Sequence, residues 1–242
     1  MMTKRQIKTS SQPVSSQQAF ASRKVRQVLS RYSSEYQRPI PSHTAIAFQE
    51  AHAAFQRSGK DSCILDAGCG TGVSTELLAV RYPDSFIIGV DKSAKRLERG
   101  ANARGMPHTQ HLDQGPTRHF IHVRAELMGF FQLAHEHGLL FKMIFFLYPN
   151  PWPKKTHLKR RVHLWPVAPL LPHITEAIEC RTNWGTFAIE FARAMQILGF
   201  ETLHVQRNFS TDSPITLFEK KYLASNHKIT IVKGHRMVTL RS

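Results

Sequence analysis

The sequence has few acidic residues and few cysteines, and it has no long apolar run. Its 242 residues include 17 Asp and Glu against 33 Lys and Arg, a formal net charge of +16. The longest apolar stretch, Met143 to Tyr148, is far shorter than the ~20 residues of a membrane-spanning helix. Cys63, Cys69 and Cys180 are scattered without CxxC spacing, which argues against a disulfide framework or a zinc site. We therefore expect no membrane span and a location in the reducing cytoplasm.

The excess of positive charge is concentrated near the N-terminus. Residues 1–60 hold 10 Lys and Arg but 2 Asp and Glu, and the first 34 residues hold seven basic residues and no acidic one. Such a charge is typical of polyanion binders, and nucleic acid is the leading partner class. The first 34 residues lack the apolar core of a secretory signal. An organellar transit peptide stays open, but we favour a basic, flexible arm over residues 1–41, followed by one domain over residues 42–242.

The remaining chain alternates short β-branched or aromatic runs with helical stretches. Apolar residues spaced by three and four predict a helix over Ser42 to Phe55. The alternation after Gly59 indicates an α/β fold with a mostly parallel, doubly wound sheet and helices on both faces. The predicted strands are Cys63 to Asp66, Phe86 to Asp91, His119 to Arg124, Met143 to Leu147 and Ala177 to Thr182, with Thr202 to Gln206 and Lys228 to Val232 as a terminal pair.

A glycine-rich loop follows the first predicted strand. Asp66-Ala67-Gly68-Cys69-Gly70-Thr71-Gly72 lies between that strand and a predicted helix, and its glycines permit positive φ and close approach of a ligand. The loop matches neither GxGxxG nor GxxxxGK[ST], so hydride transfer and nucleotide hydrolysis are disfavoured. The pattern D-x-G-x-G-x-G resembles the first motif of class I methyltransferases, which implies a Rossmann-like fold and S-adenosylmethionine as the cofactor.

This resemblance implies a set of cofactor-binding residues. Asp66 would help to hold the methionine ammonium, with Gly68, Gly70 and Gly72 beneath the methionine part. Asp91 ends the second predicted strand, where such folds place a carboxylate on two ribose hydroxyls. Glu126 follows the third strand at the position that reads the adenine amino group. The alternative is a tight turn with solvated acids, but three features in the right order favour the cofactor.

A basic segment follows the fourth predicted strand. Tyr148-Pro149-Asn150-Pro151-Trp152 precedes five Lys and Arg within the eight residues 154–161. The two prolines fix φ on either side of Asn150 and present that side chain on a stiff turn. A charge run is usually a solvated face, but this one begins at the strand end beside the expected cofactor. We therefore expect it to contact phosphates.

The same block resembles the P-D-P-W element and basic run of tRNA (guanine-N7) methyltransferases. Thr182-Asn183-Trp184 and Pro214-Ile215-Thr216-Leu217-Phe218-Glu219 resemble two later elements of that family, in the same order. The resemblance covers about residues 62–221, and it implies tRNA as the partner of an enzyme that we expect to be a monomer. It assigns catalysis to Asn150 and Glu219, with Asn150 also at the cofactor. The implied substrate-binding residues are Lys154, Lys155, Lys159, Arg160, Asn183, Thr216 and Glu219.

Two positions depart from the family pattern, because Asn150 and Asn183 stand where aspartates are expected. Asparagine offers one acceptor oxygen and no charge to a guanine edge or to a developing purinium. However, N7 has a lone pair and no proton, so its methylation needs alignment more than a general base. We expect guanine-N7 methylation of tRNA. Methyl transfer to a different RNA or small-molecule nucleophile, or a non-catalytic RNA-binding paralogue, stay as alternatives.

The histidines do not predict a metal site. His119 and His122 lie in a predicted strand, where residues three apart point to opposite faces and do not converge on one ion. We expect no bound metal.

Overall fold

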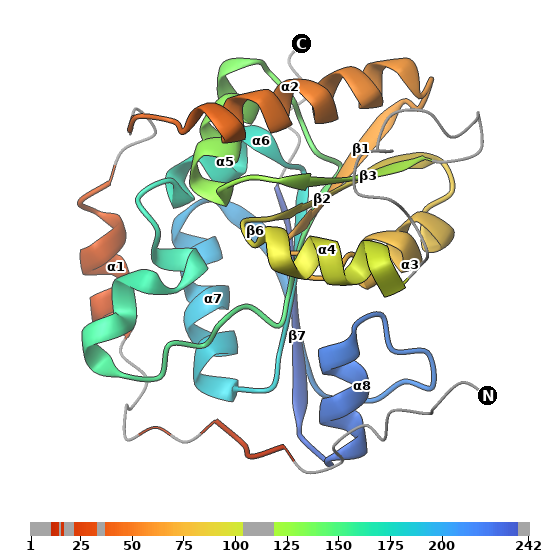
Figure 1. The fold of residues 1–242 in the computed structure, drawn as a ribbon. Helices are drawn as coiled ribbons and strands as arrows, with labels where there is room; N and C mark the ends of the chain where they lie inside the picture. Colours follow the sequence, from red (N-terminus) through yellow and green to blue (C-terminus); the bar gives the residue numbers. More distant parts are fainter. Residues whose placement is uncertain (1–10, 15, 17–21, 33–36, 104–118, 237–242) are drawn as a thin grey trace, which may run out of the picture.

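The computed structural model describes residues 11–14, 16, 22–32, 37–103 and 119–236. These residues form a seven-stranded sheet in the order β3-β2-β1-β4-β5-β7-β6, with helices packed on both faces (Figure 1). Strands β1 to β5 are parallel, while β7 runs antiparallel to both β5 and β6. The α/β fold expected from the sequence is confirmed.

The bounds of the elements follow the alternation seen in the sequence. The strands are β1 (Ser62–Ala67), β2 (Ser85–Asp91), β3 (Phe120–Arg124), β4 (Met143–Leu147), β5 (Ala177–Thr182), β6 (Phe200–Phe209) and β7 (Ile229–Arg236). The α-helices are α1 (Ser22–Leu29), α2 (Ser42–Arg57), α3 (Val73–Arg81), α4 (Ala94–Ala103), α5 (Leu127–Glu136), α6 (Leu171–Ile174), α7 (Gly185–Ile197) and α8 (Leu217–Ala224). Short 3₁₀ helices η1 (Lys155–Arg160), η2 (Val162–Leu164) and η3 (Ala168–Leu170) join β4 to α6.

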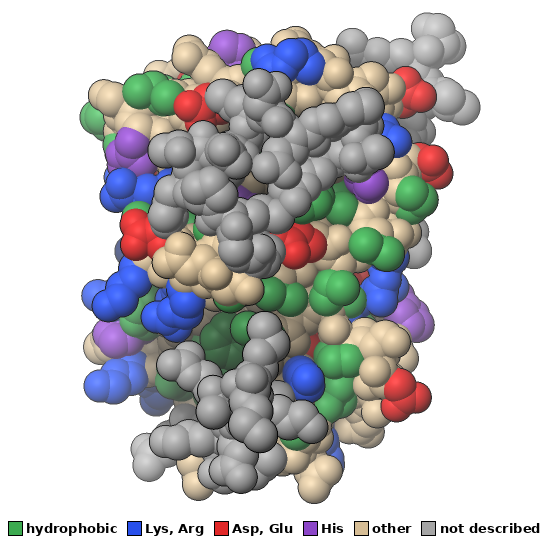
Figure 2. All heavy atoms as spheres, turned by 45° about the vertical axis from the view of Figure 1, so that its right-hand side comes forward, with side chains coloured by type: hydrophobic (Ala, Val, Ile, Leu, Met, Phe, Trp, Pro, Cys, Tyr) green, Lys and Arg blue, Asp and Glu red, His purple; other side chains and the backbone are tan. Residues whose placement is uncertain are grey.

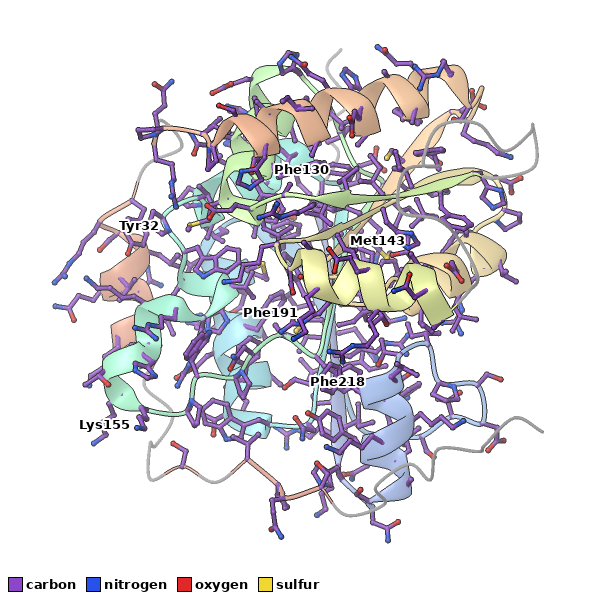
Figure 3. The ribbon with its side chains drawn as sticks, viewed as in Figure 1. Tyr32, Phe130, Met143, Lys155, Phe191 and Phe218 are labelled. Atoms are coloured by element: carbon purple, nitrogen blue, oxygen red, sulfur yellow. The ribbon has the colours of Figure 1, made fainter. Side chains whose placement is uncertain are left out.

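Each central strand is buried on both faces. Successive side chains of a strand point to opposite faces, and Ile64 and Leu65 of β1 accordingly lie in two different apolar clusters. The larger cluster packs α1, α2, α5 and α7 against the sheet, while the smaller one packs α3. Burial on both faces explains why these strands read as continuous apolar runs rather than as alternating ones. Phe191 of α7 points into the larger cluster (Figure 3).

All seven predicted strands and the helix predicted from residue 42 are confirmed, although His119 and Lys228 lie one residue before the observed starts of β3 and β7. The sequence indicated that the last two strands pair, and β6 and β7 do so. The insertion of β7 between β5 and β6 was not predicted, because sequence order does not specify spatial order in a sheet.

The expected N-terminal arm is in part a packed helix. Val25 of α1 is fully buried, and Val28 and Leu29 are also buried in the larger cluster. Helix α1 contacts α7 and η2. This part of residues 1–41 therefore differs from the free arm that the basic composition suggested, whereas residues 1–10 lie outside the described residues. The apolar spacing within Ser22–Leu29 supplies the buried face.

None of the described helices combines the length and the apolar character needed to cross a membrane. Cys63, Cys69 and Cys180 are buried free thiols.

Candidate active site

The sequence-predicted site residues meet at one edge of the sheet. Because β1 to β5 are parallel, their carboxyl ends lie on the same edge. The glycine loop follows β1, Asp91 ends β2, Glu126 follows β3, the Pro149 to Pro151 turn follows β4 and Asn183 follows β5. The loop from β6 to α8 joins them at this edge.

The glycine loop turns sharply from β1 into α3. Gly68, Gly70 and Gly72 have φ of 88°, 64° and 83°, values that favour glycine. At Gly72 an added Cβ would lie 2.3 Å from His122 Nε2, whereas nothing lies within 4 Å of a Cβ at Gly68 or Gly70. The first two glycines thus leave open space over the loop, and the third is required by packing against β3.

Asp91 ties the second strand to this loop. Its Oδ2 accepts the Gly70 backbone N–H at 3.0 Å, and its Oδ1 accepts the Ser93 N–H at 2.8 Å. Arg96, largely exposed, lies 3.4 Å from Oδ2. The carboxylate is 4% exposed, and its oxygens retain lone-pair capacity for further donors.

Asp66 is a buried carboxylate, and one of its oxygens accepts no hydrogen bond from the described residues. The hydroxyls of Ser74 and Thr75 donate to its Oδ2 at 2.6 and 2.8 Å. Its Oδ1 is buried and has no hydrogen-bond partner among the described residues. Burial raises the pKa of Asp66 to about 6, against the opposing effect of the two hydroxyls. A cation at Oδ1 would favour the ionised form.

Glu126 is more exposed than Asp66 and Asp91. It is the N-terminal flanking residue of α5, and its backbone N–H donates to Thr44 Oγ1 at 3.1 Å. Its side chain is 39% exposed and lies 3.6 Å from Arg38. The carboxylate is thus accessible beside the end of β3.

The turn after β4 is held in an unusual backbone conformation. Tyr148 and Trp152 have φ of 55° and 46°, in the left-handed region that non-glycine residues rarely adopt. Asn150 is exposed, and its Oδ1 accepts the Trp152 N–H at 3.3 Å. The turn therefore presents the Asn150 side chain to solvent at the sheet edge.

Four of the five basic residues after this turn are exposed. Lys154, Lys155, Lys159 and Arg160 lie on and beside η1, and Lys155 points outward in Figure 3. Arg161 differs, because it is fully buried and pairs with Glu190. The expectation that the whole run contacts phosphates is therefore wrong for Arg161, whose charge is compensated inside the protein.

Basic side chains also lie elsewhere on the surface. On the face drawn in Figure 2, Lys and Arg occupy several separate places between hydrophobic side chains. The excess of positive charge on the chain is thus spread beyond the segment after β4.

A cavity of about 460 Å³ lies between the first residue of α3 and α8 with the loop that precedes it. Its lining combines apolar side chains with two hydroxyls, a carboxylate and an amine, and the residues are Val73, Thr211, Asp212, Pro214, Thr216, Leu217, Lys220 and Leu223. Thr216 precedes α8, and its hydroxyl oxygen accepts the Glu219 N–H at 2.8 Å. Thr216 therefore both begins the helix and faces the cavity.

Glu219 lies inside the protein. It is 0% exposed, and its Oε1 accepts the Tyr148 hydroxyl and Arg181 Nη1, each at 2.8 Å. Its Oε2 accepts the Ile215 N–H at 2.7 Å. This placement differs from the expected direct contact of Glu219 with the substrate, because the carboxylate is enclosed by three donors.

Asn183 is half-buried and is bonded to the C-terminal part of the domain. Its amide lies 3.0 Å from His227 Nδ1, and His227 Nε2 lies 2.7 Å from the Ser11 carbonyl. Ser11 thus lies at the C-terminal end of α8, where its N–H also donates to Ser225 Oγ at 3.2 Å. Trp184 next to Asn183 packs over Arg161, with the guanidinium 4.9 Å from the ring centroid.

Sequence reasoning missed Tyr148, Arg181 and His122. The signal for Arg181 was a charged residue inside a strand with buried neighbours, which indicates a buried ion pair. No local pattern indicates the role of Tyr148 or His122, because their partners lie 71 and 50 residues away.

Solved structures share this fold. A 16S rRNA (adenine(1408)-N(1))-methyltransferase from Catenulisporales acidiphilia, solved with its cosubstrate SAM, aligns with a TM-score of 0.53 at 13% identity, over 81% of this chain and 93% of that chain. An antibiotic-related methyltransferase aligns with a TM-score of 0.51 at 15% identity, over 77% and 92%. Both solved structures are methyltransferases, and their likeness to this chain shows that the chain has the Rossmann-like fold of class I methyltransferases.

Sequence comparison identifies the family to which the chain belongs. Residues 60–231 match the family model described as "Putative methyltransferase". The tRNA (guanine-N(7)-)-methyltransferase of Ralstonia pickettii is 31% identical over 73% of this chain and 67% of that protein, and its namesake in Ralstonia nicotianae is 29% identical over 76% and 72%. The chain belongs to the tRNA (guanine-N(7)-)-methyltransferase family.

Proposed function

We propose that this protein binds tRNA in the cytoplasm and methylates N7 of a guanine. S-Adenosylmethionine supplies a sulfonium methyl group, which the N7 lone pair attacks as the carbon–sulfur bond breaks and its electrons pass to sulfur. The products are S-adenosylhomocysteine and a positively charged 7-methylguanine. No proton leaves N7, so the protein has to align the base rather than deprotonate it.

The residues at the carboxyl edge fit the cofactor. The buried Asp66 Oδ1, which has no partner in the part of the chain that the structure describes, suits an ammonium group, and the open space over Gly68 and Gly70 suits a ligand that lies on the backbone. Asp91 has the lone pairs to accept two ribose hydroxyls. Glu126, accessible after β3, would accept the adenine amino group.

The observation that carries the tRNA assignment is the order of features leaving β4. The exposed Asn150 follows the strand beside the glycine loop, and exposed Lys154, Lys155, Lys159 and Arg160 come next. Base-facing groups and phosphate-facing cations thus lie within one short segment. Asn183 and Thr216 would contact the base or its ribose from the neighbouring elements.

A different nucleophile is the second candidate. Asn150 and Asn183 are uncharged, and the Glu219 carboxylate is buried against Arg181. None of the three family positions therefore presents an exposed negative charge, which weakens the stabilisation of a developing purinium. This arrangement favours an uncharged product, and it is also compatible with RNA binding without catalysis.

One assay separates these functions. The purified full chain is incubated with methyl-labelled S-adenosylmethionine and unmodified tRNA, and the digested nucleosides are separated. We expect label in 7-methylguanosine. Label in another nucleoside would favour the second candidate, and tight RNA binding without label would leave only the binding role.

A further inference from the structure

Two buried arginine–glutamate pairs hold the turn that carries Asn150. At its start, Tyr148 donates to Glu219, which also accepts Arg181. At its end, Arg161 donates to the Trp152 carbonyl and pairs with Glu190. Both glutamates are 0% exposed.

The start of the turn is fixed through the backbone and the side chain together. The Tyr148 N–H donates to the Arg181 carbonyl of β5 at 2.8 Å, while its hydroxyl reaches Glu219 of α8. The ring also lies 5.4 Å from that of Tyr222. A non-glycine residue at φ 55° stores strain, and such strain persists only where surrounding contacts impose it.

The charge of Glu219 is compensated within this cluster. Arg181 donates to Glu219 at 2.8 Å and to Glu179 at 2.7 Å, and Lys233 lies 3.2 Å from the other Glu179 oxygen. Two carboxylates thus face two cations. Glu219 therefore acts on the turn by hydrogen bonding and leaves no unpaired negative charge for a substrate.

We propose that Tyr148 and Glu219 are positioning residues whose hydroxyl–carboxylate bond fixes the strained turn that presents Asn150. Without this bond, the left-handed Tyr148 relaxes and Asn150 loses its place at the sheet edge. That Asn150 faces a substrate rests on the proposed function. The effect of the Tyr148–Glu219 hydrogen bond on the turn is independent of the proposed function.

The test compares Tyr148→Phe, Glu219→Gln and the double variant with the natural chain. Glu136→Gln, an exposed carboxylate at the end of α5, is the matched control for charge removal. Trypsin cleavage after Lys154 and Lys155 reports the order of the turn without any need for activity. The kcat and KM values for tRNA methylation, the affinity for S-adenosylmethionine and thermal unfolding are measured in parallel.

Tyr148→Phe should accelerate cleavage at these lysines and lower kcat about tenfold or more, since misplacement of an aligning group is costly. The affinity for S-adenosylmethionine should fall much less than kcat, because Asp66, Asp91 and the glycine loop are not altered by the substitution. The double variant should be no worse than Glu219→Gln alone, as expected for two partners in one bond. Glu136→Gln should match the natural chain.

Unchanged cleavage and kcat in Tyr148→Phe would overturn the proposal. A raised KM for tRNA in Glu219→Gln with unchanged cleavage would also overturn it, because Glu219 would then contact the base. If Glu219→Gln fails to fold, Tyr148→Phe decides alone, since it removes a single oxygen. Faster cleavage in a protein that does not methylate tRNA supports the positioning role and counts against the proposed function alone.

Discussion

The Asp91 carboxylate accepts the Gly70 backbone N–H at 3.0 Å, so the end of β2 and the loop after β1 form one unit. Any ligand held by Asp91 is therefore placed in register with the glycine loop. Conversely, a change at Asp91 removes the acceptor of the Gly70 N–H and so also affects the glycine loop.

Replacing Asp91 should weaken S-adenosylmethionine binding. Asp91→Ala removes the acceptor for two ribose hydroxyls, and hydrogen bonds to a charged group contribute about 1.5–3 kcal/mol each. We expect at least about a tenfold loss of affinity, with Asp91→Asn intermediate because it keeps one acceptor. Calorimetry measures the affinity and circular dichroism reports the fold. Asp84→Ala, an exposed site, is the control, and equal affinities for both alanine variants would show that Asp91 does not hold the cofactor.

Asp66 should make stability depend on pH. Its pKa is about 6 in the folded protein against 3.8 ordinarily, so the folded state keeps a proton that the unfolded chain has lost. The contribution of Asp66 to the free energy of unfolding is complete below about pH 4 and is lost as the pH rises to about 6. At 1.36 kcal/mol per pKa unit, the loss amounts to about 3 kcal/mol. Urea unfolding of the natural chain and Asp66→Asn across this window measures the difference.

The same carboxyl group should govern the pH dependence of cofactor binding. An ammonium at Oδ1 prefers the ionised form, so affinity for S-adenosylmethionine should rise as pH increases through about 6. Asp66→Asn should remove this rise. A natural protein whose cofactor affinity is the same at pH 5 and pH 7 would contradict the assignment of Asp66 to the ammonium.

The exposed lysines after β4 should carry the salt dependence of RNA binding. Alanine at Lys154, Lys155 and Lys159 should weaken binding and flatten the slope of log affinity against log salt by ~0.7–0.9 per lost phosphate contact. The control replaces Arg57, Arg81 and Lys142, which are also exposed but precede β1, β2 and β4 and so lie toward the opposite edge of the sheet. Binding titrations at several salt concentrations give both slopes, and identical slopes would place the RNA elsewhere.

Arg161→Ala should behave differently from the lysine variants. Removing one member of a buried pair leaves Glu190 uncompensated, at a cost of about 3–5 kcal/mol in the free energy of unfolding. Denaturant unfolding measures this loss. A stable Arg161→Ala protein with weakened RNA binding would instead place Arg161 among the phosphate contacts.

Asn150→Asp should raise the rate of tRNA methylation. The aspartate keeps the acceptor for the Trp152 N–H and adds a negative charge beside the purinium that forms, which stabilises the transition state more than the neutral ground state. We expect an increase in kcat of about tenfold, measured with labelled donor and unmodified tRNA. Asn102→Asp on α4 is the exposed control. Loss of an activity that the natural chain shows would instead identify Asn150 as an adaptation to another nucleophile.

The sequence determined the features that depend on local pattern. Apolar runs separated by helical stretches predicted the strands, because a strand buried on both faces needs apolar residues at every position. The sequence also predicted that three features lie close together, namely the glycine loop, Asp91 and the Pro149 to Pro151 turn. Each lies at the carboxyl end of a predicted strand, and the carboxyl ends of parallel strands share an edge.

The roles of the charged residues were decided by tertiary structure. Arg161 reads as one more cation in a basic run, yet it is buried because Glu190, 29 residues away, lies against it. Glu219 reads as a substrate carboxylate, yet Arg181 and Tyr148 enclose it from 38 and 71 residues away. Whether a charge faces solvent or a buried partner depends on which distant segments the fold brings together, and no local spacing in the chain records that.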